Sequence, residues 1–374
     1  MRDWRTDAGA RACRFTRTPH FNRTTIAADQ TLPHPIDLDT LHQTLSALPR
    51  ASICVVGDVC LDAYWMIDQS RSEESLETSL RTQPVREQHY FAGGGSNVAM
   101  NLKALGVGRV ALFGVVGDDP FGGWLRGSLG GAGIDVTGVL VQTTDWATQV
   151  FVKPHEGGSE LARIDLGNWN RLLDSTSRGL LERVEAALPS ADIVIVNEQA
   201  LEGIHTSPDF RRSLLSLVQS RAPGRGIVDS RHYIDEFDGL MRKLNAREGT
   251  RLLGEAGVPS EYMQVEDLSR LAGQLVDRWK EPIALTAGDR GSIAATRDGV
   301  THIGAVKLEG RLDPVGAGDA YLAGLACGMA GKLDLVAAAR LGTLAAAVTV
   351  RKLHQPGTAT PAEILALAAE LRSK

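Results

Sequence analysis

ASICVVGD, residues 51–58, is the stretch from which the fold can be worked out. It is a short apolar run, rich in β-branched residues, and it ends in Gly-Asp. Such a run predicts a buried strand of a parallel sheet that delivers a loop at its carboxyl end. Further runs of the same kind follow along the chain, at 109–117, 191–198, 224–230, 281–288 and 291–299.

Helical stretches separate several of these runs, at 96–106, 177–188, 209–221 and 265–279. Strands that alternate with helices of this length predict an α/β protein with an open, mostly parallel sheet flanked by helices. In such a sheet, ligands bind beyond the carboxyl ends of the strands. We therefore expect the functional groups in the loops that follow the predicted strands.

Two segments interrupt this alternation, at about 63–92 and 148–165. Each contains short alternating runs, and the second contains a Gly-Gly turn. They predict strands of a small separate β-sheet that serves as a lid over the ligand. The expected organisation is an extension over residues 1–48 and one α/β domain over residues 49–374.

The extension is rich in arginine and lacks apolar periodicity until DLDTLHQTLSAL begins at Asp37. We expect its first 35 residues to be loosely ordered and a helix to form at its end. Arginine-rich leaders can target organelles, but this one contains Asp3, Asp7 and Asp29 and little serine. A passive tail and a start codon placed too far upstream are the alternatives.

Charge and cysteine content narrow the classes of partner. The net charge of −5 argues against general nucleic-acid binding, which needs clustered Lys and Arg. No apolar run approaches the roughly 20 residues that cross a bilayer. The cysteines are too few and too scattered for a disulfide scaffold, so we expect the protein to lie in the reducing cytoplasm. A small-molecule partner is expected. The cysteines are Cys13, Cys54, Cys60 and Cys327.

RLDPVGAGDAYLAGLACGMAG, residues 311–331, is the sharpest local motif. A glycine-rich turn runs into an apolar helix, so backbone N–H groups of Gly316, Ala317 and Gly318 can bind an anion at the positive end of the helix. Asp319, beside those donors, is placed to accept a proton from an attacking hydroxyl. The alternative is that Asp319 is only a helix cap and the glycines a tight turn.

A second glycine cluster, FAGGGSNVAMN at 91–101, also opens a helix. Gly94 and Gly95 allow a ligand to approach the backbone, and Asn97 and Asn101 present amides on one helix face. A purely structural role is the alternative. The sequence contains neither a GxxxxGK[ST] phosphate loop nor, at GVVGDDPFGG (114–123), the GxGxxG spacing of a dinucleotide site. The Asp-Asp-Pro there predicts a turn and a new helix.

These motifs stand in the order found in the ribokinase-like pfkB carbohydrate kinases, and the chain resembles that family over roughly residues 51–370. The resemblance implies a ribokinase-like fold and an ATP-dependent kinase, with Asp319 as catalytic base and the three amides as anion hole. The motifs are GDVCLD (57–62), AGGGSNVAMNLKALG (92–106), GVVGDDPFG (114–122), NARE (245–248), LTAGDRGS (285–292) and DPVGAGDA (313–320).

On the nucleotide side, the resemblance assigns Asn245 and Glu248 to the ATP phosphates, with Glu248 acting on Mg²⁺ through water. Without it, NARE is merely a polar helix start. Gly288 and Gly291 match the turn along the nucleotide phosphates. Asp313 and Gly357, the latter within HQPGTAT (354–360), match the nucleotide pocket and a monovalent-cation (K⁺) site of many relatives.

On the acceptor side, Asp62, Gly94, Gly95 and Asn97 match positions that hold sugar hydroxyls, and Asn101 is assigned to the same substrate site. Arg163, on the expected lid, could bind a phosphate already carried by the substrate. The alternative is an exposed arginine without that role. Lid strands in this family often pair between subunits, so the resemblance implies a homodimer.

GDVCLDAYW, the Ser-Arg at 70–71 and LARID look most similar to the heptose-7-phosphate kinase part of the ADP-heptose synthesis enzymes. The chain departs from them at 72–82, at Asn197 and Glu198, and at VDSRH (228–232), where Ser-Arg replaces the usual Pro-Lys. Because the sequence ends at Lys374, we expect no nucleotidyltransferase domain after the kinase.

The predicted function is therefore phosphorylation of a sugar or sugar phosphate. A nucleoside or other small-alcohol kinase, or a non-catalytic sugar-binding regulator on the same fold, are the alternatives, and a redox enzyme comes after them.

Overall fold

A nine-stranded sheet forms the centre of the computed structural model, which describes residues 36–254, 260–353 and 355–373. Its order is β14-β13-β12-β11-β10-β9-β1-β4-β5, parallel throughout except at the β12–β13 and β13–β14 pairs. The predicted mostly parallel sheet is confirmed. Its strands are β1 (Ser52–Gly57), β4 (Arg109–Gly117), β5 (Asp135–Gln142), β9 (Ile193–Glu198), β10 (Gly226–Ser230), β11 (Met241–Asn245), β12 (Ile283–Thr286), β13 (Ser292–Thr296) and β14 (Gly299–Ile303).

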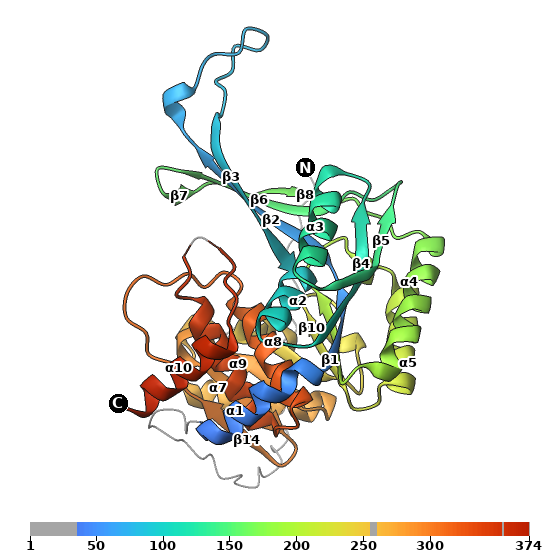
Figure 1. The fold of residues 1–374 in the computed structure, drawn as a ribbon, viewed down its shortest axis with the longest axis vertical. Helices are drawn as coiled ribbons and strands as arrows, with labels where there is room; N and C mark the ends of the chain where they lie inside the picture. Colours follow the sequence, from blue (N-terminus) through green and yellow to red (C-terminus); the bar gives the residue numbers. More distant parts are fainter. Residues whose placement is uncertain (1–35, 255–259, 354, 374) are drawn as a thin grey trace, which may run out of the picture.

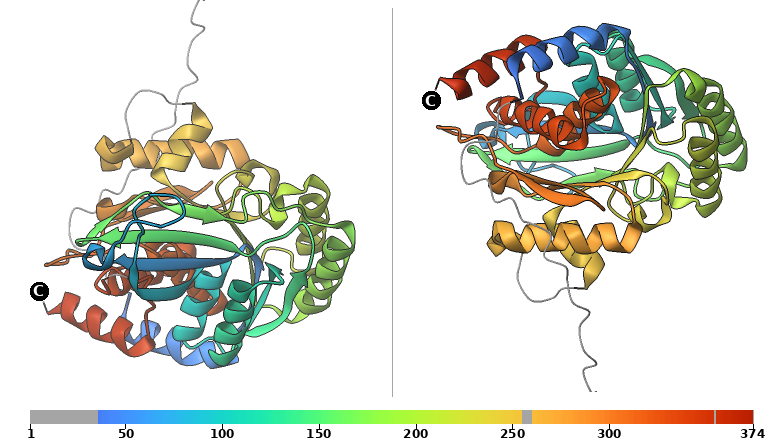
Figure 2. Two further views of the ribbon diagram at one scale, coloured as in Figure 1. Left: turned by 90° about the horizontal axis from the view of Figure 1, so that it is seen from above. Right: turned by 90° about the horizontal axis from the view of Figure 1, so that it is seen from below.

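Helices cover both faces of this sheet, and each face has its own apolar core. Figure 2 shows α7 on one side and α1 and α10 on the other. One core is built with α1 (Leu38–Ala47), α2 (Gly95–Ala104), α3 (Pro120–Gly131), α8 (Ala317–Ala330), α9 (Leu335–Thr349) and α10 (Pro361–Arg372). The other is built with α4 (Asp174–Ala187), α5 (Pro208–Arg221), α6 (Ala246–Leu253) and α7 (Val265–Trp279).

The apolar runs of the sequence all form strands, and the four predicted helices form as well. The helix expected after Asp118-Asp119 is α3, with Asp119 as its cap. Three strands were missed: β5, β11 and β14. In β11 the reason is visible, because Arg242 and Lys243 are buried charged residues and interrupt the apolar pattern.

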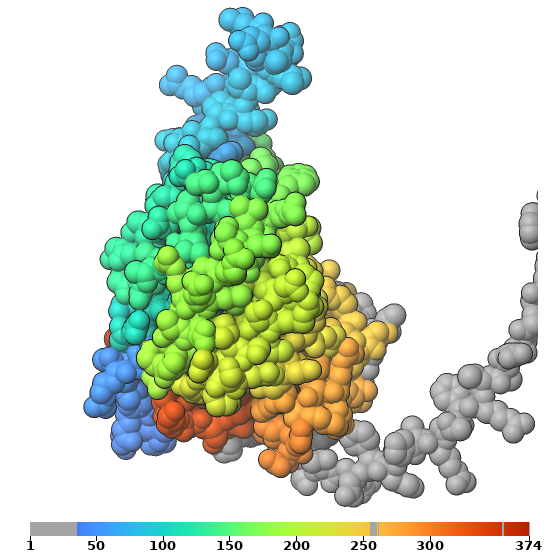
Figure 3. Space-filling model, turned by 90° about the vertical axis from the view of Figure 1, so that its right-hand side faces the viewer, coloured from blue at the N-terminus to red at the C-terminus, as the bar shows by residue number. Residues whose placement is uncertain are grey.

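A second sheet of five strands continues directly from the first, since only Asp58 separates β1 from β2. Strand β2 pairs with β3 and β6, and β6 also pairs with β7 and β8. The β2–β3 hairpin projects from the body, with Leu76 and Leu80 exposed in its tip (Figures 1 and 3). The strands are β2 (Val59–Ile67), β3 (Val85–Gly94), β6 (Gln149–Glu156), β7 (Ser159–Glu160) and β8 (Ile164–Leu166).

Helix α1 lies where a helix was expected at the end of the extension. Its Leu41 and Leu45 are buried in the core, and it lies against α10. The helix thus packs as part of the α/β body, whereas the expected loose order of the first 35 residues lies outside the described residues. Short 3₁₀ helices are η1 (Leu48–Arg50), η2 (Gln69–Arg71), η3 (Leu188–Ser190), η4 (Ile204–Thr206), η5 (Ile234–Glu236), η6 (Ser260–Tyr262) and η7 (Gly288–Arg290).

Among the residues that the structure describes, no helix combines the length and apolar character needed to span a membrane. Cys54, Cys60 and Cys327 are buried free thiols, and Cys13 lies outside the described residues.

Candidate active site

Asp319 lies in the first turn of α8, where the sequence predicted it. Gly316 precedes the helix with φ +77°, a left-handed conformation that glycine adopts without strain. The Ala317 N–H donates to the Pro314 carbonyl at 3.1 Å. Within the described residues, no backbone acceptor is recorded for the Gly316 or Gly318 N–H. The turn therefore offers the amides of Gly316 and Gly318 to an anion, whereas the Ala317 amide already has a partner.

Asn97 and Asp319 lie in direct contact. The Asn97 Nδ2 donates to Asp319 Oδ2 at 2.7 Å, and Asn101 Nδ2 donates in turn to the Asn97 backbone oxygen and to its Oδ1, at 3.0 and 3.1 Å. Both asparagines are buried on α2. In the structure Asn97 orients the candidate base and Asn101 orients Asn97. The expected contact of these amides with sugar hydroxyls stays a prediction.

The electrostatic environment of Asp319 suits a proton acceptor. Burial raises the pKa of this carboxyl to about 6, the Asn97 hydrogen bond and the Lys243 ammonium oppose that rise, and the carboxylates of Asp229 and Asp62 add to it. A base with a pKa near the working pH is both ionised and able to take a proton. Asp319 therefore combines the position and the basicity of a general base.

Lys243 and Asp229 form a buried ion pair beside this carboxyl, with Nζ 2.7 Å from Oδ2. A Cβ on Gly318 would lie 3.4 Å from the Lys243 Nζ, so the ammonium lies against the start of α8. Although burial opposes its charge, the carboxylates of Asp229 and Glu248 raise the pKa of Lys243. Sequence reasoning missed Lys243, and the only available signal was a lysine within the short run MRKLN.

Asn245 and Glu248 begin α6 as a reciprocal capping box. Asn245 Oδ1 accepts from the Glu248 N–H, and a Glu248 carboxylate oxygen accepts from the Asn245 N–H, both at 2.9 Å. Burial and the neighbouring Asp229 carboxylate raise the pKa of Glu248. NARE is therefore a polar helix start, as its sequence alone indicates. The same turn also holds the Glu248 carboxylate near Asp229 and Lys243.

The remaining residues expected on the nucleotide side have three kinds of surroundings. Gly288 has φ +62° and open space where a Cβ would stand, so a ligand can approach its backbone. Gly291 and Gly357 are required by packing, because a Cβ would lie 2.0 Å from the Ile303 oxygen and 2.9 Å from the Thr349 oxygen respectively. Asp313 closes a local turn, since its Oδ1 accepts from the Val315 N–H at 3.0 Å.

Asp62 lies on β2, with its side chain largely buried and its Oδ1 3.2 Å from Lys153 Nζ on the neighbouring β6. Burial raises the pKa of Asp62, and the Lys153 charge opposes the rise. Sequence reasoning missed Lys153. Gly94 caps α2 with φ +54°, and the Gly95 N–H donates to the Asp58 carbonyl at 2.9 Å. These two glycines therefore shape the turn between the second sheet and α2.

Arg163, for which a substrate phosphate and a plain exposed position were both left open, forms a bidentate pair with Asp165, at 2.6 and 2.8 Å, and its guanidinium lies over the Phe151 ring at 4.7 Å. The structure thus shows this arginine already partnered within the second sheet.

The fold brings Asp319, Asn97, Lys243, Asp229 and Glu248 into one electrostatic neighbourhood, and Asp62 also acts on the pKa of Asp319. They lie on strands and helices, whereas the sequence predicted functional groups in the loops after the strands. These residues come from both sheets and from α2, α6 and α8. Within the described residues, no three His, Cys, Asp or Glu side chains converge as a group that could hold a metal ion.

Comparison with known proteins identifies relatives over most of the α/β body. The family model described as pfkB family carbohydrate kinase matches residues 50–363, and the predicted resemblance is confirmed. The bifunctional protein HldE of Chromohalobacter salexigens is 31% identical over 324 residues, which are 84% of this chain and 63% of that protein. HldE of Aeromonas salmonicida is 29% identical over 86% of this chain and 64% of its own length. The chain thus spans less than two thirds of these relatives.

Solved structures show the same fold at low sequence identity. Ribokinase of Arabidopsis thaliana, complexed with ribose and ATP, superposes with a TM-score of 0.67 at 20% identity, over 85% of this chain and 98% of that one. Phosphofructokinase-2 from Escherichia coli, in complex with potassium, superposes with a TM-score of 0.68 at 20% identity, over 86% of this chain and 99% of that one. The predicted ribokinase-like fold is confirmed.

Proposed function

Because this chain belongs to the pfkB family of carbohydrate kinases, we propose that it transfers the γ-phosphoryl group of ATP to a hydroxyl of a sugar or sugar phosphate. The observation that carries the proposal is Asp319, a buried carboxyl with its pKa raised to about 6, held by Asn97 at the N-terminus of α8. If Asp319 were only a helix cap, neither the Asn97 hydrogen bond nor the raised pKa would be needed.

In the proposed reaction, a bond forms between the acceptor oxygen and the γ-phosphorus while the bond from that phosphorus to the β–γ bridging oxygen breaks. The acceptor proton passes to Asp319, and ADP leaves with the bridging oxygen. The Gly316 and Gly318 amides meet the negative charge on the transferring group. Lys243, beside Gly318, adds a fixed positive charge at the same place. Catalysis here is positioning together with charge stabilisation.

Glu248 fits a magnesium ion that keeps most of its water shell. No closed set of ligands converges in the described residues, and Mg²⁺ is commonly held through one or two carboxylates and the substrate phosphates. When bound, the ion would neutralise phosphate charge. Asn245 and the open turn at Gly288 are proposed for the ATP phosphates, and Asp313 with Gly357 for a K⁺ site.

For the acceptor, we propose that Asp62 and Lys153 hold hydroxyls at the second sheet, which acts as the lid. Curated relatives include HldE proteins, and the motifs resemble the kinase part of ADP-heptose synthesis enzymes. Heptose 7-phosphate is therefore the first acceptor to test. We further propose a cytoplasmic homodimer that pairs through the second sheet, whose hairpin tip exposes Leu76 and Leu80.

The decisive experiment measures ADP release with ATP and magnesium across sugars, sugar phosphates including heptose 7-phosphate, and nucleosides, with Asp319→Asn as control. Removing the base lowers the rate by about 10²–10⁴-fold, while ATP binding measured by calorimetry stays near that of the wild type. An Asp319→Asn protein with a near-normal rate would contradict the mechanism. A folded wild-type protein that binds ATP and is silent on every acceptor would favour the sugar-binding regulator.

A further inference from the structure

The turn that follows β10 carries a charged side chain to which the sequence assigned no role. Arg231 comes directly after Ser230, the last residue of β10, at the same edge of the sheet as Glu198 of β9 and Asn245 of β11. Its N–H donates to the Glu198 carbonyl at 3.2 Å, and Arg251 of α6 donates to its carbonyl oxygen. The backbone of Arg231 is therefore held from both neighbouring elements, while its side chain is exposed.

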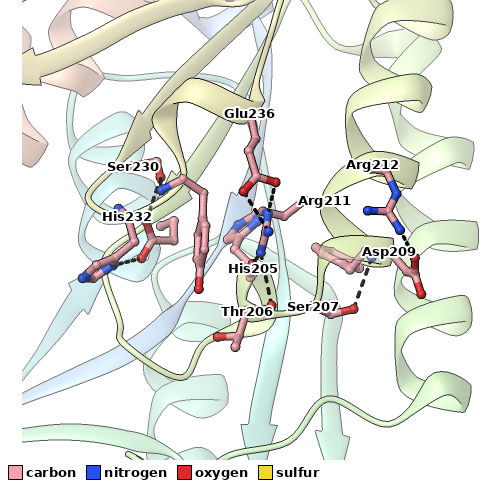
Figure 4. A network of polar contacts seen from close by, with 12 residues as sticks. His205, Thr206, Ser207, Asp209, Arg211, Arg212, Ser230, His232 and Glu236 are labelled. Atoms are coloured by element: carbon pink, nitrogen blue, oxygen red, sulfur yellow. Dashed lines mark hydrogen bonds and ion pairs between the residues drawn. The ribbon is translucent and has the colours of Figure 1, made fainter. Parts of the chain in front are cut away.

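Glu198 fixes this turn through its side chain as well. The carboxylate is fully buried and accepts from the Ser230 hydroxyl at 2.7 Å, from the His232 N–H at 2.8 Å and from the His232 ring at 2.6 Å. Although burial opposes its ionisation, the bonds from His232 and Ser230 hold the pKa of Glu198 below its ordinary value. Figure 4 shows Ser230 and His232 side by side at this turn. One buried anion thus anchors the residues on both sides of Arg231.

The Arg231 charge acts on both halves of the candidate site. Burial raises the pKa of Asp62 on the acceptor side and of Glu248 on the nucleotide side, and the Arg231 charge is among the groups that oppose both rises. In the described part of the chain, no hydrogen bond or ion pair is recorded for its guanidinium, whereas Arg163 is held by Asp165 and Lys243 by Asp229. The strand end therefore carries an exposed cation, on a fixed backbone, at the sheet edge where Asn245 and Glu248 begin α6.

We propose that Arg231 is a further catalytic residue, which contacts the transferring phosphoryl group, and that Glu198 is the positioning residue that fixes the turn carrying it. This inference rests on the proposed function. The planar guanidinium presents paired donors to phosphoryl oxygens. As the bond to the bridging oxygen breaks and the bond to the acceptor oxygen forms, the guanidinium meets charge on the peripheral oxygens. It takes no proton, because Asp319 receives the acceptor proton.

Arg231→Ala tests the proposal by steady-state kinetics, with the acceptor that gives the fastest wild-type rate in the panel above. Loss of one such charge contact lowers kcat by roughly 10²–10³-fold, with KM for ATP and acceptor nearly unchanged. Arg231→Lys retains the positive charge but not the paired donors of the guanidinium, so its kcat falls between those of the wild type and Arg231→Ala. Guanidinium chloride, added at low non-denaturing concentration, restores part of the Arg231→Ala rate, whereas sodium chloride at equal ionic strength does not.

Glu198→Gln keeps the shape of the side chain and removes the charge that anchors the turn. It lowers kcat with KM unchanged, and guanidinium does not restore its rate because Arg231 still occupies the position. Arg221→Ala is the matched control, since Arg221 is an exposed arginine at the end of α5, paired with Glu185, and its loss leaves kcat unchanged.

Two results separate the failures. A wild-type protein that turns over no acceptor removes the proposed function, and this inference with it. If the wild-type protein turns over an acceptor and Arg231→Ala has the same kcat, the inference alone is removed. The same holds if Arg231→Ala changes only the KM for the acceptor.

Discussion

Asn97 Nδ2 donates a 2.7 Å hydrogen bond to Asp319 Oδ2 across 222 positions of the sequence. The contact joins the N-terminal turn of α2, which follows the second sheet, to the N-terminal turn of α8. It favours the ionised form of the carboxyl and opposes the effect of burial on the pKa. The candidate base is therefore set by a partner that the sequence motif around Asp319 does not contain.

The rate of the enzyme should fall in acid because Asp319 must be ionised to accept a proton. Its pKa is raised to about 6, so kcat/KM should drop about tenfold per pH unit below that value. The measurement is kcat/KM as a function of pH with the acceptor identified above. Where ADP release is followed by a coupled assay, the rate is corrected for the pH dependence of the coupling enzymes. A profile that stays flat down to about pH 4.5 would be incompatible with Asp319 as the base.

Asn97→Ala should move the acidic limb of this profile to higher pH. Removing the hydrogen bond takes away a contribution that lowers the pKa of Asp319, so the pKa rises further. Asn170→Ala is a suitable control, because Asn170 is also a buried asparagine and bonds only to the Ala147 backbone in the described structure. If the acidic limb of both variants lies at the same pH as that of the wild type, the Asn97 hydrogen bond does not set the pKa of Asp319.

Lys243→Met should destabilise the fold by about 3–5 kcal/mol, since it leaves the Asp229 carboxylate buried without its counter-charge. Urea unfolding followed by circular dichroism measures the change. The double variant Lys243→Met, Asp229→Asn removes the orphaned charge and should recover part of the loss. Breaking the exposed Arg221–Glu185 pair should cost less than about 1 kcal/mol, and equal losses in both cases would argue against a buried pair.

His205 should make the protein sensitive to acid. Its ring is fully buried against Phe210 and Phe237, and burial lowers its pKa from 6.5 to about 4. Figure 4 shows His205 beside Arg211. The unfolded chain therefore binds a proton that the folded protein excludes. Stability falls as the pH drops from about 6.5 to about 4, by about 3 kcal/mol for this group. Glu198 and Arg211 are the charged groups that also influence its pKa.

His205→Phe provides the test of that last prediction. The variant should lose stability less steeply than the wild type between these pH values, as measured by urea unfolding at each pH. Parallel curves for the two proteins would show that other groups govern the acid sensitivity.

The sequence by itself determined the α/β class, the mostly parallel sheet and the position of Asp319, because apolar runs, helical periodicity and a glycine-rich turn are local properties of the chain. It also predicted separate strands around 63–92 and 148–165. Tertiary structure alone decided which side chains meet. Lys243 reaches Asp229 from the neighbouring strand, and Asn97 reaches Asp319 from a distant helix. Arg163, plausible as a free cation in the sequence, is held by Asp165. The partners of Lys243 and Asn97 depend on sheet order and helix packing, and a local motif contains no record of either; Arg163 and Asp165 are neighbours in the sequence, and the structure decided only that they pair with each other.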